Sequence, residues 1–161
     1  MNELYIPGDL VMTNGLYGGT AKDVIYKVVS SDPSHIHVLS DGTVLKGLYR
    51  LKNLEGAKIE DKGYLRYGCC YINFKDIVPV PLTSEILDNN RWRRLKSRQY
   101  TWWKARFNGV YYFIKPNKDY PSVWELCRGK ARRRFEKIRY VHQLQHFLFG
   151  LGINSEMNLE V

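Results

Sequence analysis

The segment that most restricts the fold is residues 101–115, in which Asn108-Gly109 separates two runs rich in aromatic residues. Asn-Gly is typical of a two-residue type I′ turn, because both central positions of that turn need a positive φ. This turn predicts an antiparallel hairpin in which Phe107 pairs with Val110 and Trp102 with Lys115. Since side chains alternate between the two faces of a strand, the register also predicts which residues share a face.

The predicted hairpin has one apolar face and one face on which cations and rings are neighbours. We expect the apolar face to enter the core; it holds Phe107, Val110, Ala105, Tyr112, Trp103 and Ile114. The opposite face holds Trp102, Lys104, Arg106, Tyr111, Phe113 and Lys115. Rings stack on bases and cations contact phosphates, so this second face is a candidate ligand-binding surface. Ordinary cation–π contacts, or packing against the last helix, are the alternatives.

Charge is concentrated in the same half of the chain. The 161 residues carry a net charge of +9, and residues 1–82 contain nine Lys and Arg against nine Asp and Glu. Residues 83–161 contain sixteen Lys and Arg against seven Asp and Glu, and all four Trp. A basic, aromatic half predicts a polyanionic partner. A basic surface that only favours solubility is the alternative.

Two arginine-rich runs add to this candidate site. Arg132, Arg133, Arg134 and Arg139 precede a helix predicted from about residue 139 to Gly150. An anion bound at the start of that helix would relieve the repulsion between the cations and the helix dipole; a solvated loop is the alternative. Gly129 favours a turn rather than a helix over residues 128–137. The second run, residues 91–98, contains Trp92, is followed by Tyr100 and has the same two interpretations.

The chain is predicted to be an α+β protein of two parts. Short apolar runs at residues 10–12, 24–29, 35–39, 43–49 and 64–74 predict five strands, whose spacing resembles a small SH3-like β-barrel over residues 1–80. The stiff segment Val78–Pro81 marks the boundary. A basic domain over residues 83–161 then contains a short helix capped by Thr83 or Ser84, the hairpin, a strand at 123–127 and the last helix.

Motifs for catalysis and for metal binding are missing from the sequence. There is no P-loop, GxSxG, GxGxxG or clustered group of carboxylates, so we expect no enzymatic activity and no cofactor. The three cysteines form no CxxC pair, and the HxxxH of His142 and His146 lacks the Glu of HExxH, so we expect no metal. With no signal peptide and no long apolar run, a cytoplasmic protein is expected, without contact with a membrane.

Two short motifs resemble those of a known group of proteins. Residues 79–87, PVPLTSEIL, followed by residues 140–145, YVHQLQ, resemble small uncharacterised proteins of Bacteroidota phages and prophages. In those proteins the two helices bracket an aromatic hairpin, and the likeness covers roughly residues 78–151. This chain departs from them in residues 147–150 and in its arginine-rich run. The resemblance implies a phage accessory protein in the host cytoplasm that acts on host nucleic acid or on host defence.

These features lead to one expected function and two alternatives. The expectation is non-catalytic binding of a phosphate-bearing nucleotide, which in a phage would sequester a host immune signal. The first alternative is a DNA- or RNA-binding accessory protein. The second is a host-protein inhibitor or interaction module, because Trp and Arg are also frequent anchors of protein interfaces. Assembly into a homo-oligomer stays open.

Overall fold

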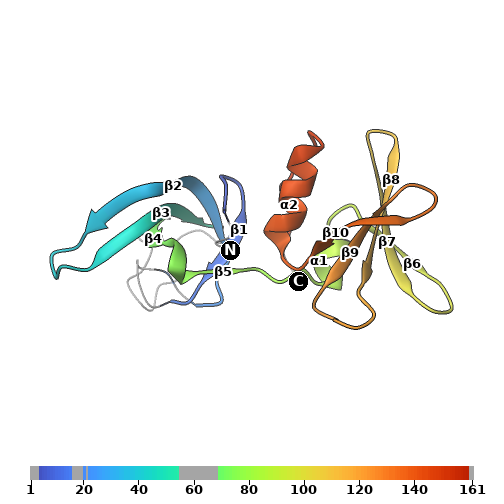
Figure 1. The fold of residues 1–161 in the computed structure, drawn as a ribbon, viewed down its shortest axis with the longest axis horizontal. Coiled ribbons are helices and arrows are strands. Elements are labelled where there is room, and N and C mark those ends of the chain that lie inside the picture. The colour runs from blue at the N-terminus through green and yellow to red at the C-terminus, as the bar shows by residue number, and fades with distance from the viewer. Residues whose placement is uncertain (1–3, 16–19, 21, 55–68, 160–161) are drawn as a thin grey trace. The chain divides into compact units, whose positions relative to one another are not determined.

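The fold is α+β, with two five-stranded antiparallel sheets and two α-helices in the part of the chain that the structure describes (Figure 1). The structure is a computed structural model, and it describes residues 4–15, 20, 22–54 and 69–159. The chain divides into two compact units, Met1–Val80 and Pro81–Val161. This division falls within the Val78–Pro81 segment, where proline restricts the backbone.

Unit 1 is built on a sheet with the strand order β4-β3-β2-β1-β5. Its strands are β1 Leu10–Thr13, β2 Tyr26–Val38, β3 Val44–Asn53, β4 Cys69–Asn73 and β5 Ile77–Pro79. A 3₁₀-helix, Phe74–Asp76, leads into β5. Its apolar core is a cluster in which the rings of Tyr5 and Tyr49 meet edge to face at 5.8 Å; the buried members are Tyr5, Val11, Tyr26, Val28, Tyr49, Leu51 and Ile77.

The predictions for unit 1 agree with the structure only in part. The strands expected at 24–29 and 35–39 are one strand, β2, because residues 30–33 stay extended and two register shifts accommodate them. The strand expected at 64–74 is β4, and residues 64–68 lie outside the described residues. Part of the boundary segment forms β5, where Pro79 pairs with Val11 at the sheet edge. An edge position tolerates a residue that has no backbone N–H.

Unit 2 is a meander in which each strand pairs with the next along the chain. Its strands are β6 Arg93–Lys96, β7 Thr101–Phe107, β8 Val110–Pro116, β9 Trp124–Arg128 and β10 Arg133–Ile138. The predicted hairpin is confirmed, since Phe107 pairs with Val110 and Trp103 with Ile114. Asn108 and Gly109 have φ values of 49° and 79°, as a type I′ turn requires.

Both helices of unit 2 lie on the apolar face of the sheet (Figure 1). Helix α1, Ser84–Asn89, begins where Thr83 Oγ1 accepts a hydrogen bond from the Ile86 N–H at 3.3 Å, and its Asp88 accepts one from Trp103 Nε1 at 2.8 Å. Helix α2, Val141–Gly150, contacts the same face through Phe147, whose ring lies 5.1 Å from that of Tyr112. The alternative in which the last helix covers the cationic face of the hairpin is therefore wrong.

The core of unit 2 is the apolar face predicted for the hairpin, together with the inward stripes of both helices. Trp103, Ala105, Phe107, Tyr112 and Ile114 are buried. On the two helices, Ile86, Leu87, Val141, Leu144 and Leu148 are also buried. Trp124 packs edge to face on Trp103 at 5.3 Å and donates a hydrogen bond to the Leu82 carbonyl at 2.9 Å, which ties the start of the unit to its sheet.

None of the helices in the described residues is long and apolar enough to cross a membrane.

Candidate functional site: a cationic and aromatic sheet face

The candidate site is the face of the unit 2 sheet opposite α1 and α2, which we call the open face. The strand register aligns two rows of side chains across it. One row runs Arg93, Lys104, Phe113, Cys127, Arg134. The other runs Leu95, Trp102, Lys115, Glu125, Lys137. Arg106 and Tyr111 form a further pair beside the hairpin turn. The alternation of side chains along β7 and β8 therefore gathers cations and rings on one surface.

Cations lie over the rings of this face. Lys104 Nζ is 4.1 Å and the Arg106 guanidinium 5.2 Å from the ring centroid of Tyr111. Lys115 Nζ lies 5.0 Å from the Trp102 centroid. The cation–π contacts considered as an alternative are therefore present. They do not exclude anion binding, because a guanidinium that stacks through its flat face keeps its N–H donors in its plane.

Arg132, in the turn between β9 and β10, lies over two rings of the open face. Its guanidinium lies 4.8 Å from the centroid of Trp102 and 4.7 Å from that of Phe113. Phe113 is only 5% exposed, so it serves as a support for the arginine rather than as a free ring. No carboxylate pairs with Arg132 among the described residues, although the side chain is exposed. A fixed cation without an ion partner is suited to an external anion.

Glu125 is a buried carboxylate on this face, and it neutralises two of the cations. It lies 3.2 Å from Lys115 Nζ and 2.8 Å from Arg134 Nη1. Burial opposes its ionisation, but the hydrogen bonds from Arg134 and Lys115 outweigh that effect, so the pKa of Glu125 is lowered. Within the described part of the chain, Arg93, Lys104, Arg106, Arg132 and Lys137 have no such ion pair. The open face thus keeps an excess of positive charge.

The structure brings together most of the residues that the sequence singles out. Those on the open face are Trp102, Lys104, Arg106, Tyr111, Phe113, Lys115, Arg132 and Arg134. Arg133 points to the opposite face, as the alternation along β10 requires. Arg139 follows β10, and its backbone N–H donates to Gln143 Oε1 at 2.7 Å. Two of the predicted residues therefore lie away from the site.

The arginine-rich run before α2 is a turn and a strand, as Gly129 predicts, rather than part of the helix. Arg132 donates its backbone N–H to the Gly129 carbonyl at 3.0 Å, and β10 begins at the next residue. The N-cap of α2 is Tyr140, whose backbone N–H donates to Gln143 Oε1 at 3.2 Å. Arg132, Arg133 and Arg134 are thus outside the first turn of α2, and they do not build an anion site at its N-terminus.

Three members of the open face were not predicted to lie there: Glu125, Lys137 and Arg93, of which Arg93 was considered only as part of the basic run 91–98. Each reaches it through pairing with a neighbouring strand, Arg93 with Lys104 and Lys137 with Glu125. Because side chains alternate between the two faces of a strand, a strand predicted over 93–96 would have placed Arg93 and Arg94 on opposite faces of the sheet. Arg94 lies on the helix side, where it forms an ion pair with Asp88 and stacks on Trp103 at 5.3 Å.

The two histidines of α2 differ in burial, since His142 is buried and His146 is half-buried. His142 is 2% exposed and stacks on Tyr140, with ring centroids 5.8 Å apart. Burial, with a smaller effect of His146, lowers the pKa of His142 to about 4, so the ring is neutral near pH 7. Within the described residues, no group of three or more His, Cys, Asp or Glu side chains could hold a metal ion.

Comparison with known proteins finds no match to this chain among protein-family models, curated proteins or solved structures. The assignment of a function therefore rests on the geometry and chemistry of the open face.

Proposed function

We propose that unit 2 is a non-catalytic binding module for phosphate-bearing nucleic-acid ligands, and that single-stranded nucleic acid is the ligand its open face suits best. The observation that carries the proposal is Arg132, a cation stacked on Trp102 and Phe113 with no ion partner among the described residues. Rings under and beside cations are the combination that single strands need, since bases stack on the rings and phosphates meet the cations.

The extent of the positive surface favours a strand over one nucleotide. Cations without an ion pair occur on β6, at Arg93, and on β10, at Lys137, which are the two edges of the sheet. Five strands at their usual spacing span about 19 Å. A single nucleotide carries its phosphates at one end, whereas a strand presents them in series and can meet cations along this whole width.

One local feature favours a second candidate, the capture of a free nucleotide. Lys115 and Arg132 both lie over the same ring, that of Trp102, at 5.0 and 4.8 Å. One ring could stack on the base of a single nucleotide, and the two cations beside it could bind the phosphates of that nucleotide. In a phage protein, such capture would sequester a nucleotide signal of host immunity.

We further propose that unit 1 is an SH3-like barrel that serves as an interaction module. The strand order β4-β3-β2-β1-β5 supports this, because the last strand returns to pair with the first. The long and irregular β2, with its two register shifts, also supports it, since bulges increase the bend of a strand.

A titration at two salt concentrations tests the proposal and separates its two candidates. Labelled single-stranded DNA and RNA of about 12 nucleotides, and a panel of nucleotides that includes cyclic dinucleotides, are titrated at 50 and 200 mM salt. Four phosphate contacts to a single strand would lower affinity about 50-fold over that range. Binding of a nucleotide would fall far less, since it displaces few counterions.

The outcomes are distinct. Steep salt dependence with the strands supports strand binding, and saturable, less salt-sensitive binding of one nucleotide favours capture. Absence of binding to both kinds of ligand contradicts the proposal. Chromatography of the ligands after incubation should return each unchanged; turnover that a single substitution abolishes would contradict the non-catalytic part.

A further inference from the structure

Two arginines face each other on the helix side of the unit 2 sheet. Arg128 in β9 and Arg133 in β10 are direct partners in the strand register, and both are exposed. Like charges directly opposite each other destabilise a pair of strands. Neither arginine is ion-paired with a residue in the described part of the chain. An anion held between them would remove this repulsion.

A pocket of suitable size opens beside this pair of arginines. It has a volume of about 400 Å³ and is lined by Tyr112, Arg128, Arg133, Phe135, Phe147 and Leu151. Small-molecule sites usually measure about 300–1,000 Å³. Three rings form its apolar wall: the Phe147 centroid lies 5.1 Å from that of Tyr112 and 5.8 Å from that of Phe135. The pocket thus combines an aromatic wall with two cations.

A bulge in β10 places Phe135 in this wall. The register shifts between Arg134 and Glu136, so that Glu136 pairs with Leu126, which lies in the core on the helix side. Phe135 nevertheless remains 49% exposed, so its apolar ring adds little to the core. Bulges of this kind re-aim side chains and are frequent beside functional sites.

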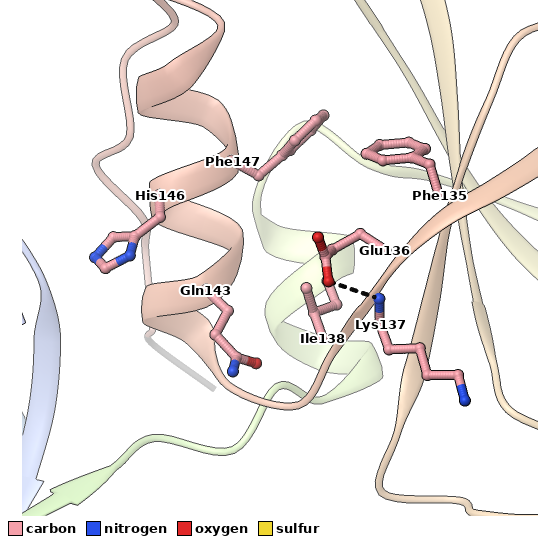
Figure 2. A pocket seen from close by; sticks show the side chains of 7 residues that line it. All are labelled: Phe135, Glu136, Lys137, Ile138, Gln143, His146 and Phe147. Carbon is pink, nitrogen blue, oxygen red and sulfur yellow. Dashed lines mark hydrogen bonds between the residues drawn. The ribbon is translucent and has the colours of Figure 1, made fainter. Parts of the chain in front are cut away.

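A second hollow, next to this pocket, indicates at which end of the pocket the anionic group of a ligand would bind. It measures about 360 Å³ and lies between β10 and α2. Figure 2 shows Phe135 and Phe147 pointing toward each other there, with the Glu136 carboxylate between the strand and the helix. A carboxylate repels a phosphate, so the anionic end of a ligand belongs at Arg128 and Arg133.

We propose that this pocket binds a nucleoside monophosphate unit, with its phosphate between Arg128 and Arg133 and its base against Phe135 and Phe147. The unit could come from a free nucleotide or from the phosphorylated 5′ end of a strand, since both present a base and a terminal phosphate. The site is on the opposite face of the sheet from Arg132, and it does not depend on the function proposed for the open face.

Calorimetric titration of the full chain with the four nucleoside 5′-monophosphates tests the pocket. We expect saturable binding that weakens roughly 10- to 100-fold in Arg133→Gln or Arg128→Gln, the loss expected for a charge-assisted hydrogen bond. Phe135→Leu should also weaken it. Lys118→Gln, in an exposed loop of unit 2, is the charge-matched control and should leave it within about twofold. Inorganic phosphate alone and the nucleosides should both bind more weakly than the monophosphates.

A second readout guards against variants that fail to fold. Because Arg128 and Arg133 repel each other, Arg133→Gln should keep or raise the melting temperature of the free protein. A fall in melting temperature, or monophosphate binding that is absent or insensitive to both arginines, overturns the proposal. Equal affinity for phosphate alone removes the role of the rings and also overturns it.

Two oligonucleotides of one sequence, with a 5′-phosphate or a 5′-hydroxyl, distinguish the sources of the ligand. A preference for the phosphorylated strand that Arg133→Gln abolishes assigns the pocket to strand ends. Monophosphate binding without that preference assigns it to free nucleotides. If the pocket binds no monophosphate, the Arg132-dependent binding of single strands is still expected. The two proposals can therefore be contradicted separately.

Discussion

The guanidinium of Arg132 lies 4.8 Å from the ring centroid of Trp102, although the two residues belong to different hairpins. The turn between β9 and β10 makes this contact. Arg132 has a φ of 49°, and its backbone N–H donates to the Gly129 carbonyl at 3.0 Å. The tight turn directs the side chain across β9 onto the rings of β7 and β8, where it joins Lys115, a cation that β8 itself places over Trp102.

Replacing Arg132 by Gln should weaken binding of single strands without unfolding unit 2. Loss of a charge-assisted phosphate contact costs about 1.5–3 kcal/mol of binding free energy. The loss of its cation–π contacts should lower the free energy of unfolding by only about 0.5–1 kcal/mol. Fluorescence titration and chemical unfolding measure the two quantities. Lys118→Gln, in an exposed loop, is the control; an equal loss of affinity there would indicate an unspecific charge effect.

The adjacent tryptophans should respond in opposite ways. Trp102→Ala removes a stacking platform on the open face and should cost about 1–3 kcal/mol of binding free energy. Trp103 is 4% exposed and packs on Trp124, so Trp103→Ala should lower the free energy of unfolding by about 3–5 kcal/mol. Urea unfolding measures the free energy of unfolding of both variants, and titration with a single strand measures their binding free energy. Binding loss at Trp103 with stability loss at Trp102 would reverse the assignment of the two faces.

The stability of unit 2 should decline as the pH falls below about 6.5, because His142 is buried in its neutral form. The pKa of His142 is lowered to about 4 in the folded state, from a usual value of 6.5. The unfolded chain therefore binds a proton between these values and the folded chain does not, so stability present above pH 6.5 is lost progressively toward pH 4. The full effect is roughly 3 kcal/mol.

Tryptophan fluorescence measures this effect in unit 2 alone, since all four Trp lie there. Unfolding in urea at pH 7.5 and 5 gives the dependence, and His142→Asn should flatten it. An unchanged slope in His142→Asn would show that another group causes the decline.

Gly109→Ala should destabilise the β7–β8 hairpin through its backbone alone. Gly109 has a φ of 79°, and an added Cβ would meet no atom within 4 Å. The left-handed conformation costs an alanine about 1–2 kcal/mol, and Gly109→Asn should recover part of it, because Asn tolerates this conformation. Gly150→Ala is the control, since that site is equally open but lies in a helix without a positive φ. Equal unfolding free energies for the two alanine variants would contradict the prediction.

Local signals in the sequence predict the hairpin, α1 and the faces of β7 and β8. Asn108-Gly109 determines the register, and the register separates Trp102 from Trp103. Signals of this kind do not reach between strands that are distant in sequence. The pairing of Lys137 with Glu125, the bulge that places Phe135 in a pocket, and the stacking of Arg132 on Trp102 all depend on the β9–β10 hairpin. The positions of the arginines relative to one another could therefore not be predicted from the sequence, although the sequence does show how many there are.

The meander of unit 2 has a consequence for the order in which a growing chain can fold. Each strand pairs with its predecessor, so the five strands form local contacts, which arise quickly. The ends of the unit meet only later: the Leu82 N–H donates to the Arg139 carbonyl at 2.9 Å. Asn90 and Asn158 exchange two hydrogen bonds at 2.6 Å. During synthesis the sheet can assemble strand by strand on the ribosome, while the two hydrogen bonds between Asn90 and Asn158 form only after residue 158 has emerged.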